Sequence, residues 1–232
     1  MSIADNLKKV SERIQKATEH AARPVGSVRL LAVSKTRTPD ELRAAIAAGQ
    51  TAFGENYLQE GLDKIAALSD TPNLEWHFIG PIQSNKTRAI AEHFQWVHSV
   101  DRLRVAQRLN DQRPADIQPL SVCIQVNVDA EATKSGVAPE QVAELAGALL
   151  EMPRLHLRGL MAIPDPNLAP AELRRRFAGL AAQLEALRER WPSVGPNCLD
   201  TLSMGMSGDL EDAIAEGATL VRVGTALFGS RQ

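Results

Sequence analysis

The sequence has 232 residues, of which 44% are hydrophobic and 23% charged, and its formal net charge is −2. This length suits a single domain with a full hydrophobic core, and the composition excludes a disordered chain. The balanced charge gives no electrostatic basis for binding nucleic acid or an anionic membrane surface, so we expect neither as a partner.

The chain shows no sign of export. Residues 1–17 alternate charged and apolar side chains at helical spacing and lack the apolar run of a signal peptide. No later run approaches membrane-spanning length. The two cysteines, Cys123 and Cys198, have no CxxC spacing and offer no disulfide framework. We therefore expect a cytoplasmic protein in a reducing compartment.

Short apolar runs alternate with amphipathic stretches along the whole chain, a pattern typical of βαβ units and a parallel sheet. Most of these runs are apolar through their length, as expected of strands that are buried on both faces. The predicted strands cover residues 30–34, 51–55, 76–80, 96–100, 121–128, 157–163, 199–204 and 220–224.

Two predicted helices have clear signals. Thr38 supplies an N-cap hydroxyl, Pro39 occupies the first helical position, Glu41 the third, and Gly49 ends the helix. Residues 171–190 form a longer amphipathic helix that we expect to pack on the outside of a barrel. Its apolar face consists of Leu173, Phe177, Leu180, Leu184 and Leu187.

Eight strands with helices between them predict a single (β/α)8 TIM barrel, as one domain over residues 1–232. An open doubly wound sheet is the alternative. That fold favours a glycine-rich turn after the first strand, where this sequence reads SKTRT at 34–38. Proline-rich breaks at 112–119, 164–170 and 192–196 are interpreted as loops, because the alternation resumes after each one.

Lys35 directly follows the first predicted strand, and barrel chemistry takes place at the C-terminal ends of strands. Strand parity puts Lys35 on the same face as Leu31 and Val33, which a barrel turns inward. An inward lysine is partly desolvated, which favours the neutral amine that attacks a carbonyl carbon. A lysine that reaches solvent or pairs with a carboxylate is the alternative.

The last two predicted strands lead into loops of small residues. Residues 202–209 contain Ser203 and Gly205, and a Gly-Thr pair at 224–225 precedes a predicted helix. Amides and hydroxyls in such paired loops bind phosphate in many barrels, although tight turns without a ligand are the alternative. Parity also turns Arg222 inward, where its partner is either a buried carboxylate or a ligand nitrogen or phosphate.

Seven motifs follow one another along the chain. They are AVSKT (32–36), FGENYLQE (53–60), HFIGPIQSNK (77–86), TKSG (133–136), RGLMAI (158–163), LSMGMSGD (202–209) and VRVGTALFG (221–229). Together they resemble the motifs of the pyridoxal phosphate homeostasis proteins, and the resemblance covers essentially the whole chain.

The resemblance implies a monomeric barrel like the N-terminal domain of alanine racemase. It implies that pyridoxal 5′-phosphate is held as an internal aldimine on Lys35, that Arg222 contacts the pyridine nitrogen, and that Asn56 contacts the cofactor. The implied phosphate contacts are Ser203, Gly224 and Thr225.

Two further residues are less sharply assigned by the resemblance. It implies that Lys134 and His77 are neighbours of the cofactor or of a transfer route, and the alternatives are an ordinary loop lysine and a hydrogen-bonded core histidine. The remaining histidines show no metal-ligand spacing, so we expect no metal site. They are His20, His93, His98 and His156.

An arginine at the ring nitrogen bears on function. It favours an unprotonated nitrogen and weakens carbanion stabilisation by the ring. Racemisation also needs a second acid–base group on the opposite face of the cofactor. The racemases that the chain resembles take it from a C-terminal domain, whereas eight residues follow Gly224 here, and nothing places Tyr57, the one tyrosine, on that face.

We therefore expect a non-enzymatic protein that binds and buffers pyridoxal phosphate and delivers it to apo-enzymes. A weak racemase-like enzyme that uses the same cofactor is the first alternative. The second is a lysine Schiff-base aldolase that acts on a phosphorylated sugar and needs no cofactor.

Overall fold

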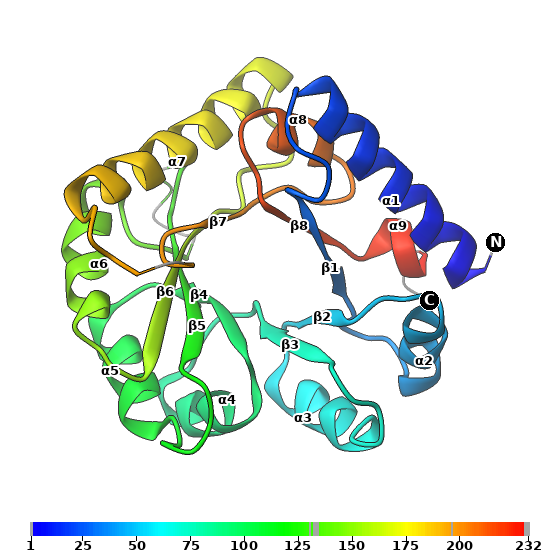
Figure 1. The fold of residues 1–232 in the computed structure, drawn as a ribbon, viewed down its shortest axis with the longest axis horizontal. Helices are drawn as coiled ribbons and strands as arrows, with labels where there is room; N and C mark the ends of the chain where they lie inside the picture. Colours follow the sequence, from blue (N-terminus) through cyan, green and yellow to red (C-terminus); the bar gives the residue numbers. More distant parts are fainter. Residues whose placement is uncertain (1, 130, 132–134, 196, 230–232) are drawn as a thin grey trace.

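The computed structural model describes residues 2–129, 131, 135–195 and 197–229. Within them, eight parallel strands form a closed barrel in which each strand pairs with its sequence neighbours and the first pairs with the last (Figure 1). The strands are β1 (Arg29–Val33), β2 (Ala52–Glu55), β3 (Glu75–Phe78), β4 (Trp96–Val100), β5 (Leu120–Gln125), β6 (Leu155–Met161), β7 (Thr201–Ser203) and β8 (Leu220–Val223). The predicted (β/α)8 barrel is confirmed.

Helices surround the barrel and cover the outer face of its strands (Figure 1). They are α1 (Ile3–His20), α2 (Pro39–Ala47), α3 (Leu58–Ala67), α4 (Thr87–His93), α5 (Leu103–Gln112), α6 (Val142–Leu150), α7 (Pro170–Arg190), α8 (Leu210–Ala215) and α9 (Thr225–Phe228), with short 3₁₀ turns at Ser84–Lys86 and Pro139–Gln141. The capping box predicted at Thr38 is present, because its hydroxyl accepts from the Glu41 amide and the Glu41 carboxylate accepts from the Thr38 amide.

The predicted strands agree with the structure apart from their ends. The largest difference is at the fifth strand, predicted over 121–128, which ends at Gln125. There the backbone leaves the barrel wall, since the Val137 amide donates to Gln125 and the Asn127 amide donates to Val137. The apolar run continues past the strand because Val126 is buried by this loop.

The core has two parts. The larger lies between the strands and the helices and includes the predicted face of α7, whose five apolar residues are all buried. The smaller fills the barrel itself, with Leu31, Ala52 and Leu220 in one group and Trp96, Cys123 and Met161 in another. Successive side chains of a strand face the two parts in turn. Both faces of each strand are therefore buried, which explains the continuous apolar runs in the sequence.

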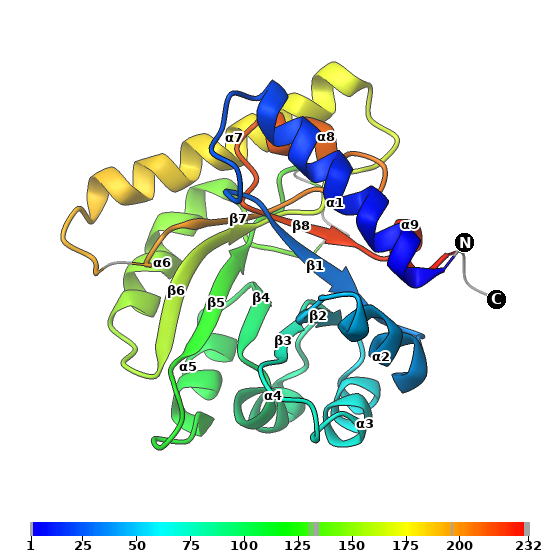
Figure 2. The same ribbon diagram turned by 45° about the vertical axis from the view of Figure 1, so that its right-hand side comes forward.

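The barrel closes where β1 meets β8. Arg29 pairs with Leu220 and Ala32 with Val223, which brings the C-terminal ends of these two strands to the same mouth of the barrel. On the outside, α1 contacts α8 and α9, as Figure 2 shows from the side. In the described part of the chain, no helix combines the length and the apolar character needed to cross a membrane.

Candidate functional site

A cavity of about 280 Å³ opens at the C-terminal mouth of the barrel. Its lining comes from the ends of β1, β2 and β8 and from the loops after β3, β6 and β7. The lining residues are Val33, Lys35, Asn56, Ile79, Ile163, Met206, Ser207, Gly208, Arg222, Gly224 and Thr225. A larger cavity of about 580 Å³ lies beside the start of β6 and the end of α7, but its described lining contains no lysine.

Lys35 follows β1, and hydrogen bonds hold the residue before it. The Ser34 hydroxyl donates to Glu55 Oε1 at 2.5 Å, and the Ser34 carbonyl accepts from Lys64 Nζ at 2.6 Å. Lys64 Nζ also donates to Glu55 Oε1 at 2.8 Å. The backbone of the candidate nucleophile is therefore fixed by two buried, oppositely charged side chains.

The residue after Lys35 is held as well. Thr36 has a φ of +64°, a conformation that is unusual for a β-branched residue. Its amide donates to the carboxylate of Glu60, which also accepts from Lys64 Nζ at 2.6 Å. Glu55, Glu60 and Lys64, here called the Lys64 cluster, thus anchor the backbone on both sides of Lys35.

Asn56 enters the cavity from the end of β2. Its backbone passes so close to Gly80 that a Cβ at residue 80 would lie 2.0 Å from the Asn56 carbonyl oxygen. Only glycine permits this approach. Among the described residues, the buried Oδ1 of Asn56 finds no hydrogen-bond partner. A buried acceptor of this kind is ready for a donor from a ligand.

Arg222 projects from β8 into the barrel and is 4% exposed. Its Nη1 donates to the carbonyl of Ser203 at 2.5 Å and to the Ser203 hydroxyl at 2.8 Å, and its Nη2 donates to the Ala162 carbonyl at 2.9 Å. Burial lowers the pKa of Arg222 to about 10, and the charge of Asp209 acts in the opposite direction. The side chain remains a buried cation at neutral pH beneath the cavity.

The loops after β7 and β8 meet at the cavity. The Ser207 hydroxyl accepts from the Ala226 amide at 3.4 Å. The loop after β7 turns at Gly205, which has a φ of +93° and where a Cβ would lie 2.6 Å from that of Ala213. The Met206 amide donates to Asp209 at 2.5 Å. Small residues therefore line one side of the cavity with backbone and hydroxyl groups.

The structure brings together most of the residues that the sequence singled out. Lys35, Asn56, Arg222, Gly224 and Thr225 all line the cavity. Ser203 does not, because it is fully buried at the end of β7 and its hydroxyl is bonded inside the barrel.

Sequence reasoning missed Ser207 and Gly208 as cavity residues. Both belong to the LSMGMSGD motif, so the signal was present. The strand in this motif ends at Ser203, and the loop that faces the cavity begins after it. The end of the strand therefore decides which serine reaches the mouth.

The other residues that the sequence raised lie elsewhere. His77 is fully buried inside the barrel with both ring nitrogens hydrogen-bonded, and it does not line the cavity. Tyr57 precedes α3 with its residue surface 58% exposed. Lys134 lies outside the described residues. No cluster of potential metal ligands occurs in the part of the chain that the structure covers.

Comparison with known proteins identifies a family and a relative to which the chain is similar. Residues 6–232 match the family described as alanine racemase, N-terminal domain. The pyridoxal phosphate homeostasis protein of Pseudomonas aeruginosa is 60% identical over 230 residues, which cover 99% of this chain and 96% of that protein.

Two solved structures are informative. PipY of Synechococcus elongatus, solved with PLP bound, is 37% identical with a TM-score of 0.84, over 98% of this chain and 100% of that chain. Alanine racemase from Corynebacterium glutamicum is 19% identical with a TM-score of 0.71, over 99% of this chain but 61% of that chain. The second likeness concerns the fold alone.

Proposed function

This chain belongs to the pyridoxal phosphate homeostasis proteins, and from that premise we propose that it binds pyridoxal 5′-phosphate as a Schiff base on Lys35, without being an enzyme. It acts in the cytoplasm as a monomer that buffers the cofactor and delivers it to apo-enzymes. Both of its cysteines are free thiols, which suits a reducing compartment.

The observation that carries this proposal is the single cavity that joins Lys35 to Arg222 and to two loops of small residues. Pyridoxal phosphate has an aldehyde, a ring nitrogen and a phosphate, and each needs a different protein group. Lys35 supplies an amine for the aldehyde. Arg222 supplies an N–H donor for the ring nitrogen. Oδ1 of Asn56, which has no partner among the described residues, also fits a polar group of a ligand.

The phosphate is assigned to the side of the cavity formed by Ser207, Gly208, Gly224 and Thr225. Backbone amides and hydroxyls in such loops bind an anion without a neighbouring positive side chain. Gly208 is exposed, with no atom within 4 Å of the position that a Cβ would occupy, so the loop leaves room for phosphate oxygens.

The same residues support storage rather than catalysis. When bound, pyridoxal phosphate supplies an electrophilic carbon and a ring that withdraws electrons best when its nitrogen is protonated. The permanently protonated Arg222 disfavours that proton and so limits carbanion stabilisation. Tyr57 does not line the cavity, so this tyrosine is not placed to exchange a proton there.

The test is the absorption spectrum of the purified protein with pyridoxal phosphate. We expect a Schiff-base band that borohydride traps, that is lost in Lys35→Ala and that is kept in Lys86→Ala, a change of an exposed lysine. If the parent protein shows no band, the cofactor assignment fails and a sugar-phosphate aldolase becomes the better hypothesis.

Two activity measurements complete the test. Incubation of an apo-enzyme with the loaded protein should restore the enzyme's activity faster than incubation with free cofactor. The free cofactor is released from denatured protein and used at an equal total concentration. Incubation with amino acids in deuterated water should leave their Cα hydrogens unexchanged. Steady exchange or net racemisation would contradict the non-enzymatic role and favour a weak enzyme.

A further inference from the structure

A row of polar side chains crosses the inside of the barrel beneath the cavity. It begins at the N-terminal mouth, where β3 starts, passes through β4 and β7, and ends at Arg222 on β8. We call it the interior row, and its members are Glu75, His77, His98 and Ser203. None of these four lines the cavity, so the proposed cofactor chemistry does not use them directly.

Each member is within hydrogen-bond distance of the next. Glu75 Oε1 lies 2.8 Å from His77 Nε2, and His77 Nδ1 lies 2.8 Å from His98 Nε2. His98 Nδ1 lies 2.7 Å from Ser203 Oγ, and that oxygen accepts from Arg222 Nη1 at 2.8 Å. The row therefore links Arg222 through three side chains to the carboxylate of Glu75, in addition to the charge of Asp209 that acts on the guanidinium.

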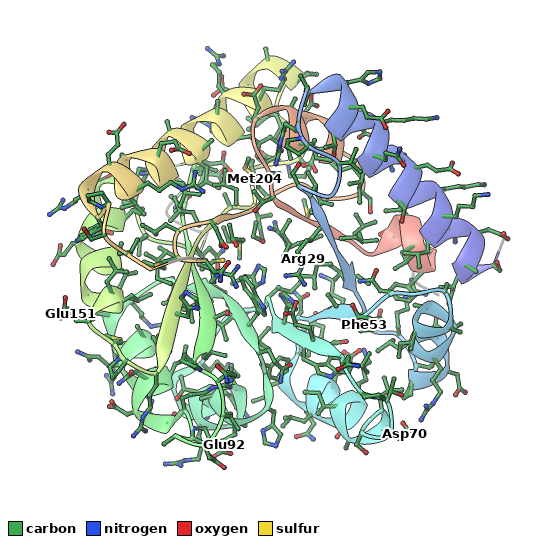
Figure 3. The ribbon with its side chains drawn as sticks, in the orientation of Figure 1. Arg29, Phe53, Asp70, Glu92, Glu151 and Met204 are labelled. Atoms are coloured by element: carbon green, nitrogen blue, oxygen red, sulfur yellow. The ribbon has the colours of Figure 1, made fainter. Side chains whose placement is uncertain are left out.

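The surroundings hold this row in place. Both histidines are fully buried, and the ring of His77 stacks on Trp96 with their centroids 5.2 Å apart. At the N-terminal mouth, Arg29 donates to Glu75 Oε1 at 2.5 Å. Figure 3 shows Arg29, the partner of Glu75 at this mouth, near the centre of the ring of strands.

The groups at the two ends of the row determine which atom donates and which accepts in each of its hydrogen bonds. Burial lowers the pKa of His77 and lowers that of His98 well below the ordinary range, so both rings are neutral at pH 7. A carboxylate only accepts, which puts the His77 proton on Nε2 and leaves its Nδ1 as an acceptor. His98 then donates from Nε2, and Ser203 donates to His98 Nδ1.

The other end gives the same direction. An arginine only donates, so the Ser203 oxygen accepts from Arg222 and its proton is available to His98. Donors therefore point from Arg222 to Glu75 along the whole row. Hydrogen bonds aligned in this way strengthen one another, because a group that donates one hydrogen bond becomes a better acceptor of another.

We propose that the interior row positions the Arg222 guanidinium for the cofactor, with His98 and Ser203 as positioning residues and Glu75 as the terminal acceptor. This inference rests on the proposed function, because it assigns the row to the residue that faces the ring nitrogen. The row holds Nη1 of Arg222 inside the barrel and thereby sets which edge of the guanidinium faces the cavity. A substitution at the N-terminal mouth then changes how the guanidinium is held at the opposite end of the barrel.

The first test needs no cofactor. Long-range ¹H–¹⁵N correlation spectra of the ligand-free protein report the tautomer of each imidazole, with His77→Gln and His98→Gln for assignment. We expect both rings to be neutral and protonated at Nε2. A ring protonated at Nδ1 in either histidine would overturn the proposal, whatever the protein does with pyridoxal phosphate.

The second test measures cofactor affinity by absorbance in Glu75→Gln and Ser203→Ala. Glu75→Gln changes a residue at the mouth, far from the cavity, and should weaken binding about threefold and alter the tautomer signals of both histidines. Ser203→Ala should weaken it about tenfold, because Arg222 loses its link to the row. The matched control is Asp200→Asn, which removes another carboxylate that pairs with an arginine, Arg158 at 2.6 Å.

Asp200 precedes β7, and its hydrogen bonds go to Arg158 and Thr201 rather than to a member of the row, so its variant should bind like the parent within twofold. Folded Glu75→Gln protein with parental affinity and parental tautomer signals would overturn the proposal, even if Ser203→Ala fails to fold. Failure of the parent to bind pyridoxal phosphate would instead refute the proposed function, while the tautomer spectra would still decide whether the row exists.

Discussion

Replacing Lys64 with methionine should lower the free energy of unfolding by about 3–5 kcal/mol. The Lys64 side chain is 4% exposed, and its ammonium contacts the carboxylates of Glu55 and Glu60 at 2.8 and 2.6 Å. Methionine has a similar volume, so little packing is lost. The loss comes from Glu55, whose fully buried carboxylate is left without its cation.

The loss should depend on pH in a defined direction. Burial raises the pKa of Glu55 even though Lys64 acts to lower it, and removal of the lysine raises the pKa further. A carboxyl group whose pKa is higher in the folded protein than in the unfolded chain destabilises the fold when it is ionised, and this cost disappears when it is protonated. The difference in the free energy of unfolding between parent and variant is therefore largest at neutral pH. It becomes smaller as the pH falls toward the ordinary glutamate pKa of about 4.3.

Urea unfolding followed by circular dichroism, at neutral pH and at several lower values, measures this difference. Lys86→Met is the matched control, since that lysine is exposed, and it should change stability by less than about 0.5 kcal/mol. The double variant Glu55→Gln with Lys64→Met should recover part of the loss, because no buried charge remains. A loss below about 1 kcal/mol, or one that is independent of pH, would refute the reasoning.

Three further outcomes are expected. Gly80→Ala should weaken cofactor binding at least about tenfold in an absorbance titration, because its Cβ displaces the Asn56 backbone; unchanged affinity would contradict this. Phe177→Ala should lower stability by about 3–5 kcal/mol, since the ring is fully buried on the inner face of α7, and a melting curve that shifts by only a degree or two would be inconsistent. Burial raises the pKa of Cys123 to about 12, so iodoacetamide at pH 8 should alkylate Cys198 first by mass spectrometry, and faster labelling of Cys123 would disprove it.

Much of the fold could be predicted because strand and helix periods are local properties of the sequence. The apolar face of α7 and the capping box at Thr38 are read from spacing alone, and both are present. Strand parity also turned Leu31 and Arg222 inward correctly. These predictions need no knowledge of which strands are neighbours.

The candidate site could be predicted only in part because some of its geometry depends on strand register. His77 and His98 carry no motif in common, and their contact at 2.8 Å follows only from the position of β3 against β4. Lysine is a residue type that is usually exposed, yet Lys64 of α3 is buried against Glu55 at the end of β2. Long polar side chains that turn inward leave no periodic signal.

The seam between β1 and β8 has a consequence for how the protein is made. Lys35 follows the first strand and Gly224 the last, 189 positions later (224 minus 35), and the two come to one cavity only through this pairing. Contacts so distant in sequence form late, since the entropy of closing the intervening loop opposes them until the other strands are in place. A chain still emerging from the ribosome without its last strand has the lysine but not the cavity. Under the proposed function, the cofactor is therefore captured only after the barrel has closed.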